Sequence, residues 1–130
     1  MLELHHIGNL VDDIDLAAAT YQLLFGKNCI SDKVLVSTQG VYVCFIDIGK
    51  KVFIELIQPV DKNSMVYKIR KKGISYYHLA YLTDDFDNTS SFLLSHNFRA
   101  MDIFSSEAFD NKRCQFMYTP EGSLIELIEK

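Results

Sequence analysis

The sequence has little of what would place it in several large classes of protein. Its three cysteines are widely spaced and form no CxxC pair, so neither a disulfide framework nor a thiolate zinc site is indicated. No apolar run approaches the roughly 20 residues that a membrane-spanning helix needs, and the first residues contain no signal-peptide core. Basic residues number 13 against 17 acidic ones, which argues against a general nucleic-acid-binding protein. We therefore expect a cytoplasmic protein with neither membrane nor nucleic acid among its partners.

The chain does have enough apolar surface for a real core. Of its 130 residues, 48% are hydrophobic and 12% are aromatic, so disorder is not expected. A chain of this length is typical of one compact unit, and repeated motifs indicate that the unit has two similar halves.

The first repeated motif is a glutamate in the middle of an apolar pentapeptide. It occurs as Phe53-Ile54-Glu55-Leu56-Ile57 and again as Leu124-Ile125-Glu126-Leu127-Ile128. An ionised carboxylate is costly to bury unless it is paired with another group or bound to a metal. Since the same costly pattern occurs twice, we expect both glutamates to have a partner inside the protein.

A histidine recurs at the same interval, to within one residue. His6 and His78 each begin a short apolar stretch that ends in an aspartate pair. One histidine and one buried glutamate in each half make up a ligand set suited to a divalent metal, since imidazole and carboxylate both bind such ions. His5 precedes His6 in the same predicted strand, so we expect its side chain to point to the opposite face.

The two halves also share a predicted order of elements, strand–helix–strand–strand–strand. The aspartate pairs at 12–13 and 84–85 are suited to cap the helices that follow them, and this explains them more simply than a second metal site. Ser64 could cap a short connecting helix that runs to Lys72. We predict strands over 2–11, 29–37, 41–48, 51–58, 75–82, 98–104, 112–119 and 123–129, and helices over 14–25 and from the second aspartate pair to about Ser95.

These elements predict an α+β fold made of one domain. Its first module covers about 1–60, a connector covers about 61–73, and its second module covers about 74–130. A sheet with one helix leaves one face uncovered, so two such modules can form a cupped, partly open barrel lined by their inner faces. If His6 and Glu55 point inward, His78 and Glu126 do so by pseudo-symmetry, and the four side chains converge.

At this point the chain resembles the vicinal oxygen chelate superfamily, which includes glyoxalase I, methylmalonyl-CoA epimerase, ring-cleaving dioxygenases and bleomycin-resistance proteins. The resemblance covers nearly the whole chain and is closest to methylmalonyl-CoA epimerase. Ile54-Glu55-Leu56-Ile57-Gln58-Pro59 is similar to the IELLxP of the epimerases, and residues 63–73 are similar to their connector. Pro120-Glu121-Gly122 and Ile125-Glu126-Leu127-Ile128-Glu129 resemble bacterial glyoxalase I.

The resemblance implies a metal-dependent enzyme that acts on a small molecule. Its metal ligands would be His6, Glu55, His78 and Glu126, which suit Co, Mn, Ni, Fe or Zn. The implied activity is that of an isomerase, here an epimerase, or a lyase, acting through an enolate that the metal stabilises, with Glu126 or Glu55 as the base. Alternatives are a lactoylglutathione lyase of the glyoxalase I type, or a non-catalytic small-molecule-binding or resistance protein. Members of the superfamily usually pair, so a homodimer is expected.

Three differences from the epimerases lie around the predicted site and leave its ligands unchanged. This chain has Tyr77-His78 where the epimerases usually have two histidines, and its segment 105–111 lacks their paired glycines. The turn at Pro120-Glu121-Gly122 is shorter than theirs. In addition, Val43 or its neighbours stand where some epimerases carry a further active-site carboxylate. The basic segment Lys68–Lys72 would attract the phosphates of an acyl-CoA, although a solvated helical face also explains it.

Overall fold

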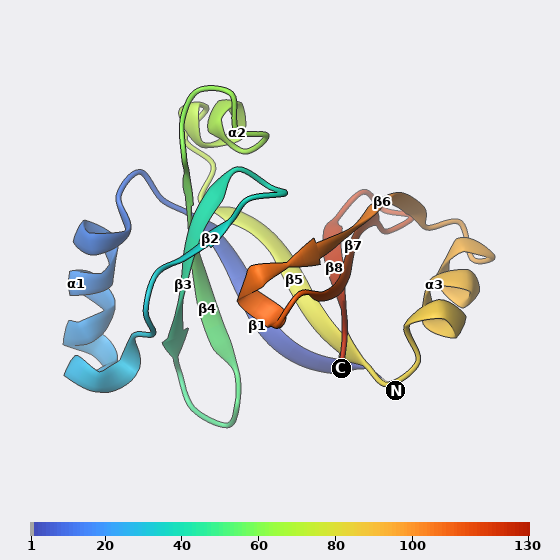
Figure 1. The fold of residues 1–130 in the computed structure, drawn as a ribbon, viewed down its shortest axis with the longest axis horizontal. Helices are drawn as coiled ribbons and strands as arrows, with labels where there is room; N and C mark the ends of the chain where they lie inside the picture. Colours follow the sequence, from blue (N-terminus) through green and yellow to red (C-terminus); the bar gives the residue numbers. More distant parts are fainter. Residues whose placement is uncertain (1) are drawn as a thin grey trace.

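A computed structural model describes residues 2–130, which form one curled, mixed sheet of eight strands with helices on its outside (Figure 1). The strand order is β2-β3-β4-β1-β5-β8-β7-β6. The elements of the first half are β1 (Glu3–Leu10), α1 (Ile14–Phe25), η1 (Lys27–Cys29), β2 (Val34–Val36), β3 (Val41–Asp47) and β4 (Phe53–Pro59). Those that follow are α2 (Tyr67–Lys71), β5 (Tyr76–Thr83), α3 (Phe86–Leu94), β6 (Arg99–Ser106), η2 (Glu107–Phe109), β7 (Lys112–Tyr118) and β8 (Leu124–Glu129).

The strand pairing joins the two halves at the centre of the sheet. β1 lies antiparallel to β5, and each of them also pairs in parallel with the last strand of its own half, β4 or β8. The four central strands are therefore β4, β1, β5 and β8, which are the strands that contain the repeated histidines and glutamates. The predicted α+β fold, with two βαβββ units curled into a partly open barrel, is confirmed.

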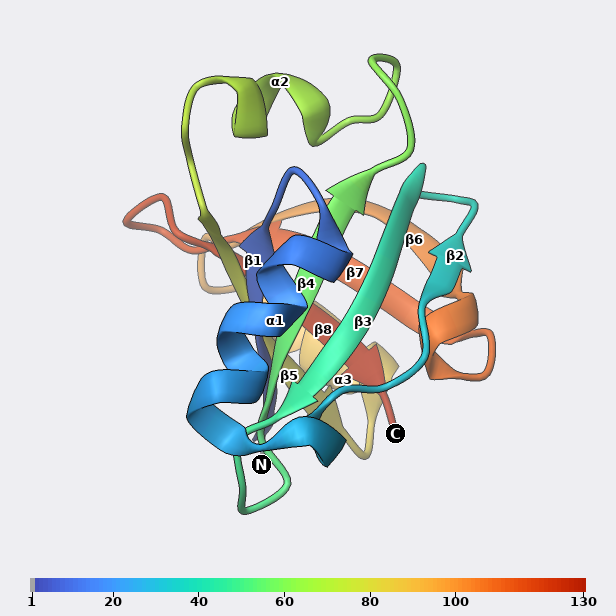
Figure 2. The same ribbon diagram turned by 90° about the vertical axis from the view of Figure 1, so that its left-hand side faces the viewer.

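α1 and α3 each cover the outer face of their own half, and this decides which side chains face inward. α1 packs through Ile14 and Ala18 against Ile46 and Leu56 of the sheet, and Figure 2 shows this helix lying in front of the sheet. Because side chains alternate along a strand, burying Leu56 on the outer face turns Glu55 to the inner one. In the second half α3 packs through Phe86 against outward-facing residues of β7 and β8. The outer core therefore directs both glutamates into the cup.

Two predicted boundaries were wrong. The strand predicted over 29–37 is mostly irregular: a 3-10 turn ends at Cys29, Ile30 forms an isolated bridge with Ile46 of β3, and the continuous pairing with β3 is confined to Val34–Val36. Ser64 does not cap α2, which begins at Tyr67 after Val66, and the buried Ser64 hydroxyl has no hydrogen-bond partner within residues 2–130. Among residues 2–130, no helix is both long and apolar enough to span a membrane.

The aspartate pairs act as helix caps, as predicted. The Asp13 carboxylate accepts hydrogen bonds from the backbone N–H groups of Asp15 (2.8 Å) and Leu16 (3.1 Å), and Asp85 accepts one from Asn88 (3.2 Å). Asp12 instead accepts two hydrogen bonds from Arg70, at 3.0 and 3.3 Å, which ties the connector to the start of α1.

Removal of the first cap should cost stability without touching the interior of the cup. We expect Asp13→Ala to lower the free energy of unfolding by about 1 kcal/mol, because two backbone donors lose their acceptor. Urea denaturation followed by circular dichroism measures this loss. Asp84→Ala is the control, since Asp84 is exposed and its ion pair with Lys130 lies at the surface. Equal losses in both variants would contradict the capping role.

Candidate metal centre

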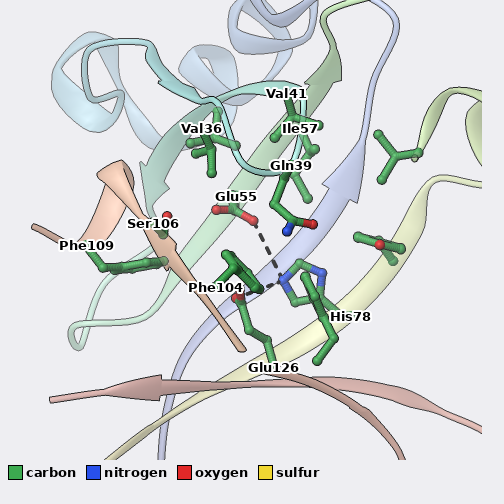
Figure 3. Close-up of a pocket in the computed structure, with 14 residues that line it drawn as sticks. Val36, Gln39, Val41, Glu55, Ile57, His78, Phe104, Ser106, Phe109 and Glu126 are labelled. Carbon is green, nitrogen blue, oxygen red and sulfur yellow. Dashed lines mark ion pairs between the residues drawn. The ribbon is translucent and has the colours of Figure 1, made fainter. Parts of the chain in front are cut away.

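Four ionisable side chains from the four central strands meet at the bottom of the cup. His6 Nε2 lies 3.0 Å from His78 Nε2, 3.3 Å from Glu55 Oε1 and 3.4 Å from Glu126 Oε1. His78 Nε2 lies 3.7 Å from Glu55 Oε1 and 3.5 Å from Glu126 Oε1, the two contacts drawn in Figure 3. All four residues are buried, with exposed fractions of 0–6%. The structure thus brings together the four residues that the sequence predicts as ligands.

The strand register explains this convergence. On the inner face, Gly8 of β1 lies between Glu55 of β4 and His78 of β5. In the next row Ala80 of β5 lies between His6 of β1 and Glu126 of β8. The four large polar side chains therefore surround two of the smallest residues, and both rows follow from the repeat.

Gly8 leaves the space that the His78 ring occupies. A Cβ atom added at Gly8 would lie 2.6 Å from Nδ1 of His78 and closer still to its Cε1. Ala80 holds the equivalent position in the other row and is fully buried. No larger side chain fits at Gly8 while His78 keeps its place.

The charges in this cluster oppose the effect of burial. Burial by itself would lower the pKa of His6, but the carboxylates of Glu55 and Glu126 outweigh it and raise that pKa to about 10. Burial would likewise favour neutral Glu126, yet the adjacent imidazoles hold the pKa of this carboxyl below its usual value. The two pKa shifts keep His6 and Glu126 charged although they are buried. A cation between the buried carboxylates would therefore be strongly stabilised.

The donor set fits a divalent metal. The ligand atoms of His6, Glu55 and His78 all lie within 4.8 Å of one another, as atoms around one ion must. Glu126 Oε1 is buried, and its contacts with the two imidazoles are longer than a good hydrogen bond, so it keeps a lone pair directed at the cluster. Two imidazoles and two carboxylates suit Mn, Co, Ni, Fe or Zn.

His5 does not point away from His6, and that prediction was wrong. The pairing of β1 with β5 shifts register between Leu4 and His6, so strict alternation fails there. As a result His5 Nδ1 lies 2.9 Å from His6 Nδ1. Burial lowers the pKa of the His5 imidazole to about 4. A bulge at this position is not visible in the sequence.

A partly open cavity ends at the cluster, with a volume of about 30 Å³. Glu55, His78 and Glu126 lie at its base, and Gln39 extends its amide group into it (Figure 3). Its walls are aliphatic on one side and aromatic on the other, formed by Val36, Val41, Val43, Ile57 and Val66 and by Tyr77, Phe104, Phe109 and Phe116. Gln39 and Ser106 are polar lining residues outside the cluster, and neither was found from the sequence, because turns and strand ends have no periodic pattern.

β2 and β6 are the two edge strands of the sheet. Beside the cavity, hydrogen bonds link the end of β2 to the end of β6 and so bridge the open side of the cup. The Glu107 carboxylate accepts hydrogen bonds from the backbone N–H and the hydroxyl of Ser37, at 3.1 and 2.7 Å. The Thr38 hydroxyl donates to the carbonyl of Ser105 at 3.1 Å. These contacts keep the turn that contains Gln39 against the second half.

Comparison with known proteins identifies the class to which this fold and cluster belong. A family model described as the Glyoxalase/Bleomycin resistance protein/Dioxygenase superfamily matches residues 5–128, so the chain belongs to that superfamily. The predicted family is therefore confirmed. The sequence matches no curated protein.

Several solved structures of similar fold are methylmalonyl-CoA epimerases. The epimerase from Mycobacterium tuberculosis is 28% identical, with a TM-score of 0.83 over 97% of this chain and 86% of that one. A methylmalonyl-CoA epimerase in complex with methylmalonyl-CoA and NH4+ is 22% identical, with a TM-score of 0.85 over 100% and 95%. A variant of the Streptomyces coelicolor epimerase in complex with 2-nitronate-propionyl-CoA is 23% identical, with a TM-score of 0.84 over 98% and 94%. The last two likenesses establish the fold alone.

Proposed function

We propose that this protein is a divalent-metal-dependent isomerase or lyase that moves a proton on a carbon next to a carbonyl group, most like methylmalonyl-CoA epimerase. One observation supports this most directly: a largely apolar cavity ends at Glu55, His78 and Glu126, and Nε2 of the buried His6 lies 3.0–3.4 Å from an atom of each of them. A cavity that ends at a metal site is suited to bring a substrate oxygen to the metal.

The metal would be held by His6, Glu55, His78 and Glu126. When bound, such an ion supplies Lewis-acid stabilisation of the negative charge that develops on a substrate oxygen. The apolar walls exclude water, so electrostatic effects at the base of the cavity are stronger than they would be in solvent.

The proton must then be moved by a group at the base of the cavity. Glu55 and Glu126 are the only carboxylates among the described residues that line it, and Val43 offers none from β3. Because a general base has to lie within hydrogen-bond reach of the proton, we assign this step to one of these two glutamates.

The lining favours an acyl substrate over a glutathione adduct. No lysine or arginine is among the described lining residues, whereas the carboxylates of a glutathione adduct would need cationic partners. The aliphatic wall is suited to a short acyl chain, and Val66, which lines the cavity, directly precedes α2. Lys68, Lys71 and Lys72 are exposed on or directly after this helix, where phosphates of a carrier such as coenzyme A could lie. A glyoxalase-type lyase and a non-catalytic binding protein are the alternatives.

Metal binding is the first test. Titration of the metal-free protein with Co²⁺, Mn²⁺, Ni²⁺, Fe²⁺ or Zn²⁺ is expected to raise its melting temperature, by the equivalent of about 2.7 kcal/mol once the free metal reaches 100 times its Kd. Calorimetric titration checks the stoichiometry of one ion per chain. A protein that binds none of these ions would contradict the proposal and favour the binding-protein alternative.

Substrate choice is tested by hydrogen–deuterium exchange. In D2O the metal-loaded protein is expected to exchange the α-proton of methylmalonyl-CoA, as followed by NMR. The methylglyoxal–glutathione adduct serves as the comparison, because its exchange alone would favour the lyase. Exchange of neither substrate with any of the metals would overturn both enzyme assignments.

A further inference from the structure

His5, which precedes the candidate ligand His6, lies within hydrogen-bond distance of the His6 ring. We propose that His5 is a positioning residue that fixes the tautomer and the orientation of the His6 imidazole. The inference rests on the proposed metal site, and it gives a role to a side chain that the proposed reaction does not use.

The two nitrogens of the His6 ring face different partners. Nε2 faces the cluster, 3.0 Å from His78 Nε2 and 3.3 Å from Glu55 Oε1. Nδ1 faces away from it and lies 2.9 Å from Nδ1 of His5. A metal at the centre of the cluster can therefore be bound only through Nε2 of His6.

Binding through Nε2 decides where the ring proton must be. The Nε2 lone pair is free for a metal only if the neutral His6 ring carries its proton on Nδ1. That N–H then donates to the lone pair on Nδ1 of His5, whose own proton lies on Nε2. The 2.9 Å separation suits such a hydrogen bond. His5 thus favours the one tautomer of His6 that can be a ligand.

His5 is itself held in place by packing. Its ring lies edge-on to Phe45 and Phe109, with centroids 5.8 and 5.3 Å away, and tilted against Phe53 at 5.1 Å. Phe45 and Phe109 also contact the His6 ring. The shift in strand register that brings His5 beside His6 therefore places it in an aromatic cage, which restricts rotation of both rings.

The second imidazole has no such partner. Nδ1 of His78 is buried and makes no hydrogen bond among the described residues. Tyr77 precedes His78 as His5 precedes His6, but its ring only packs edge-on to His78, with centroids 5.0 Å apart. The pseudo-symmetric site is thus asymmetric in this respect: Nδ1 of His6 makes a hydrogen bond, whereas Nδ1 of His78 makes none among the described residues.

The consequence is measurable in metal affinity. A hydrogen bond to the far nitrogen of a metal-binding imidazole makes the ring a better donor and fixes its angle, and its loss typically weakens binding by about 10- to 100-fold. Phenylalanine at position 5 would keep a ring in the cage and remove the acceptor. Asparagine would lose the ring but place its Oδ1 near the position of Nδ1, where it can accept the same hydrogen bond.

The experiment compares three variants by titration with Co²⁺. We expect H5F to bind Co²⁺ about 10- to 100-fold more weakly than the native protein, and H5N to bind it within a few-fold of native. Y76F, a control at an exposed position of the strand that contains His78, should bind as the native protein does. The d–d absorption of bound Co²⁺ should change in H5F and return toward the native spectrum in H5N, which a role in packing alone would not produce. Melting curves of the metal-free variants check that each is folded.

The outcomes separate this role from the proposed metal site. Native affinity and spectrum in H5F would overturn the role of His5 and leave the metal site standing. Equal losses in H5F and H5N would also overturn it, because packing would then explain the effect. If the native protein binds no Co²⁺ or other divalent ion, both the metal site and the role of His5 are wrong.

Discussion

Glutamine in place of Glu126 or of Glu55 is expected to stop proton exchange in one of the two variants while both still bind metal. Glutamine keeps the shape of the side chain and an oxygen that can bind a cation, but its amide cannot accept the proton. Loss of a general base typically costs about 10²- to 10⁴-fold in rate. Because these are the only carboxylates among the described residues at the cavity, no neighbour is placed to replace the lost base.

The measurement pairs exchange rate with metal content for each variant. The variant that loses its base should lose turnover with metal still bound, and the other should retain measurable exchange. Glu121→Gln is the matched control, because Glu121 is exposed in the turn before β8. Turnover at the native rate in both cavity variants would refute the assignment of the base. Loss of metal in either variant would instead make that glutamate essential as a ligand.

Much of the fold could be predicted because the sequence repeats itself. The pentapeptides around Glu55 and Glu126 and the stretches after His6 and His78 recur in the same order, so an inference made for one half could be checked in the other. The face was left as a condition by the sequence: alternation puts the glutamates on the inner face once Leu56 and Leu127 beside them pack outward, as they do in the structure. Burial of charge was thus the most informative signal in the chain.

The remainder depends on contacts that a sequence pattern does not encode. His5 lies beside His6 because the strand register shifts within β1. A prediction from sequence assumes strict alternation, and a shift of one residue reverses the face of the sheet to which a side chain is assigned. Gln39, Ser106 and Phe109 reach the cavity from a turn, a strand end and a 3-10 segment. Their positions follow from contacts between the two halves, such as the bond from Ser37 to Glu107.

The rows of the inner sheet face show that the site depends on small residues as much as on charged ones. Glu55 and His78 flank Gly8, and His6 and Glu126 flank Ala80. A larger side chain at Gly8 would occupy the space that the His78 ring fills. Glycine at position 8 therefore has a steric purpose, and its backbone conformation does not require glycine, since its φ lies outside the left-handed region.

Alanine at Gly8 is accordingly expected to displace the His78 ring and damage the site. The new methyl group would lie 2.6 Å from His78 Nδ1, and the ring has little room to retreat, because Tyr77 and Phe116 pack edge-on against it with centroids 5.0 and 5.1 Å away. Overpacking of this kind costs about 1–3 kcal/mol of stability. A ligand moved by about 1 Å can lower turnover about 100-fold.

Denaturation curves, Co²⁺ titration and exchange kinetics measure the three effects of Gly8→Ala. Ala80→Gly is the control at the equivalent position of the other row, where a methyl group is removed instead of added. It should lose at most about 1 kcal/mol of stability, through the greater freedom of the unfolded chain, and bind Co²⁺ as the native protein does. Native Co²⁺ affinity in Gly8→Ala would mean that His78 can move without leaving the cluster, and that the space at Gly8 does not determine the position of this imidazole.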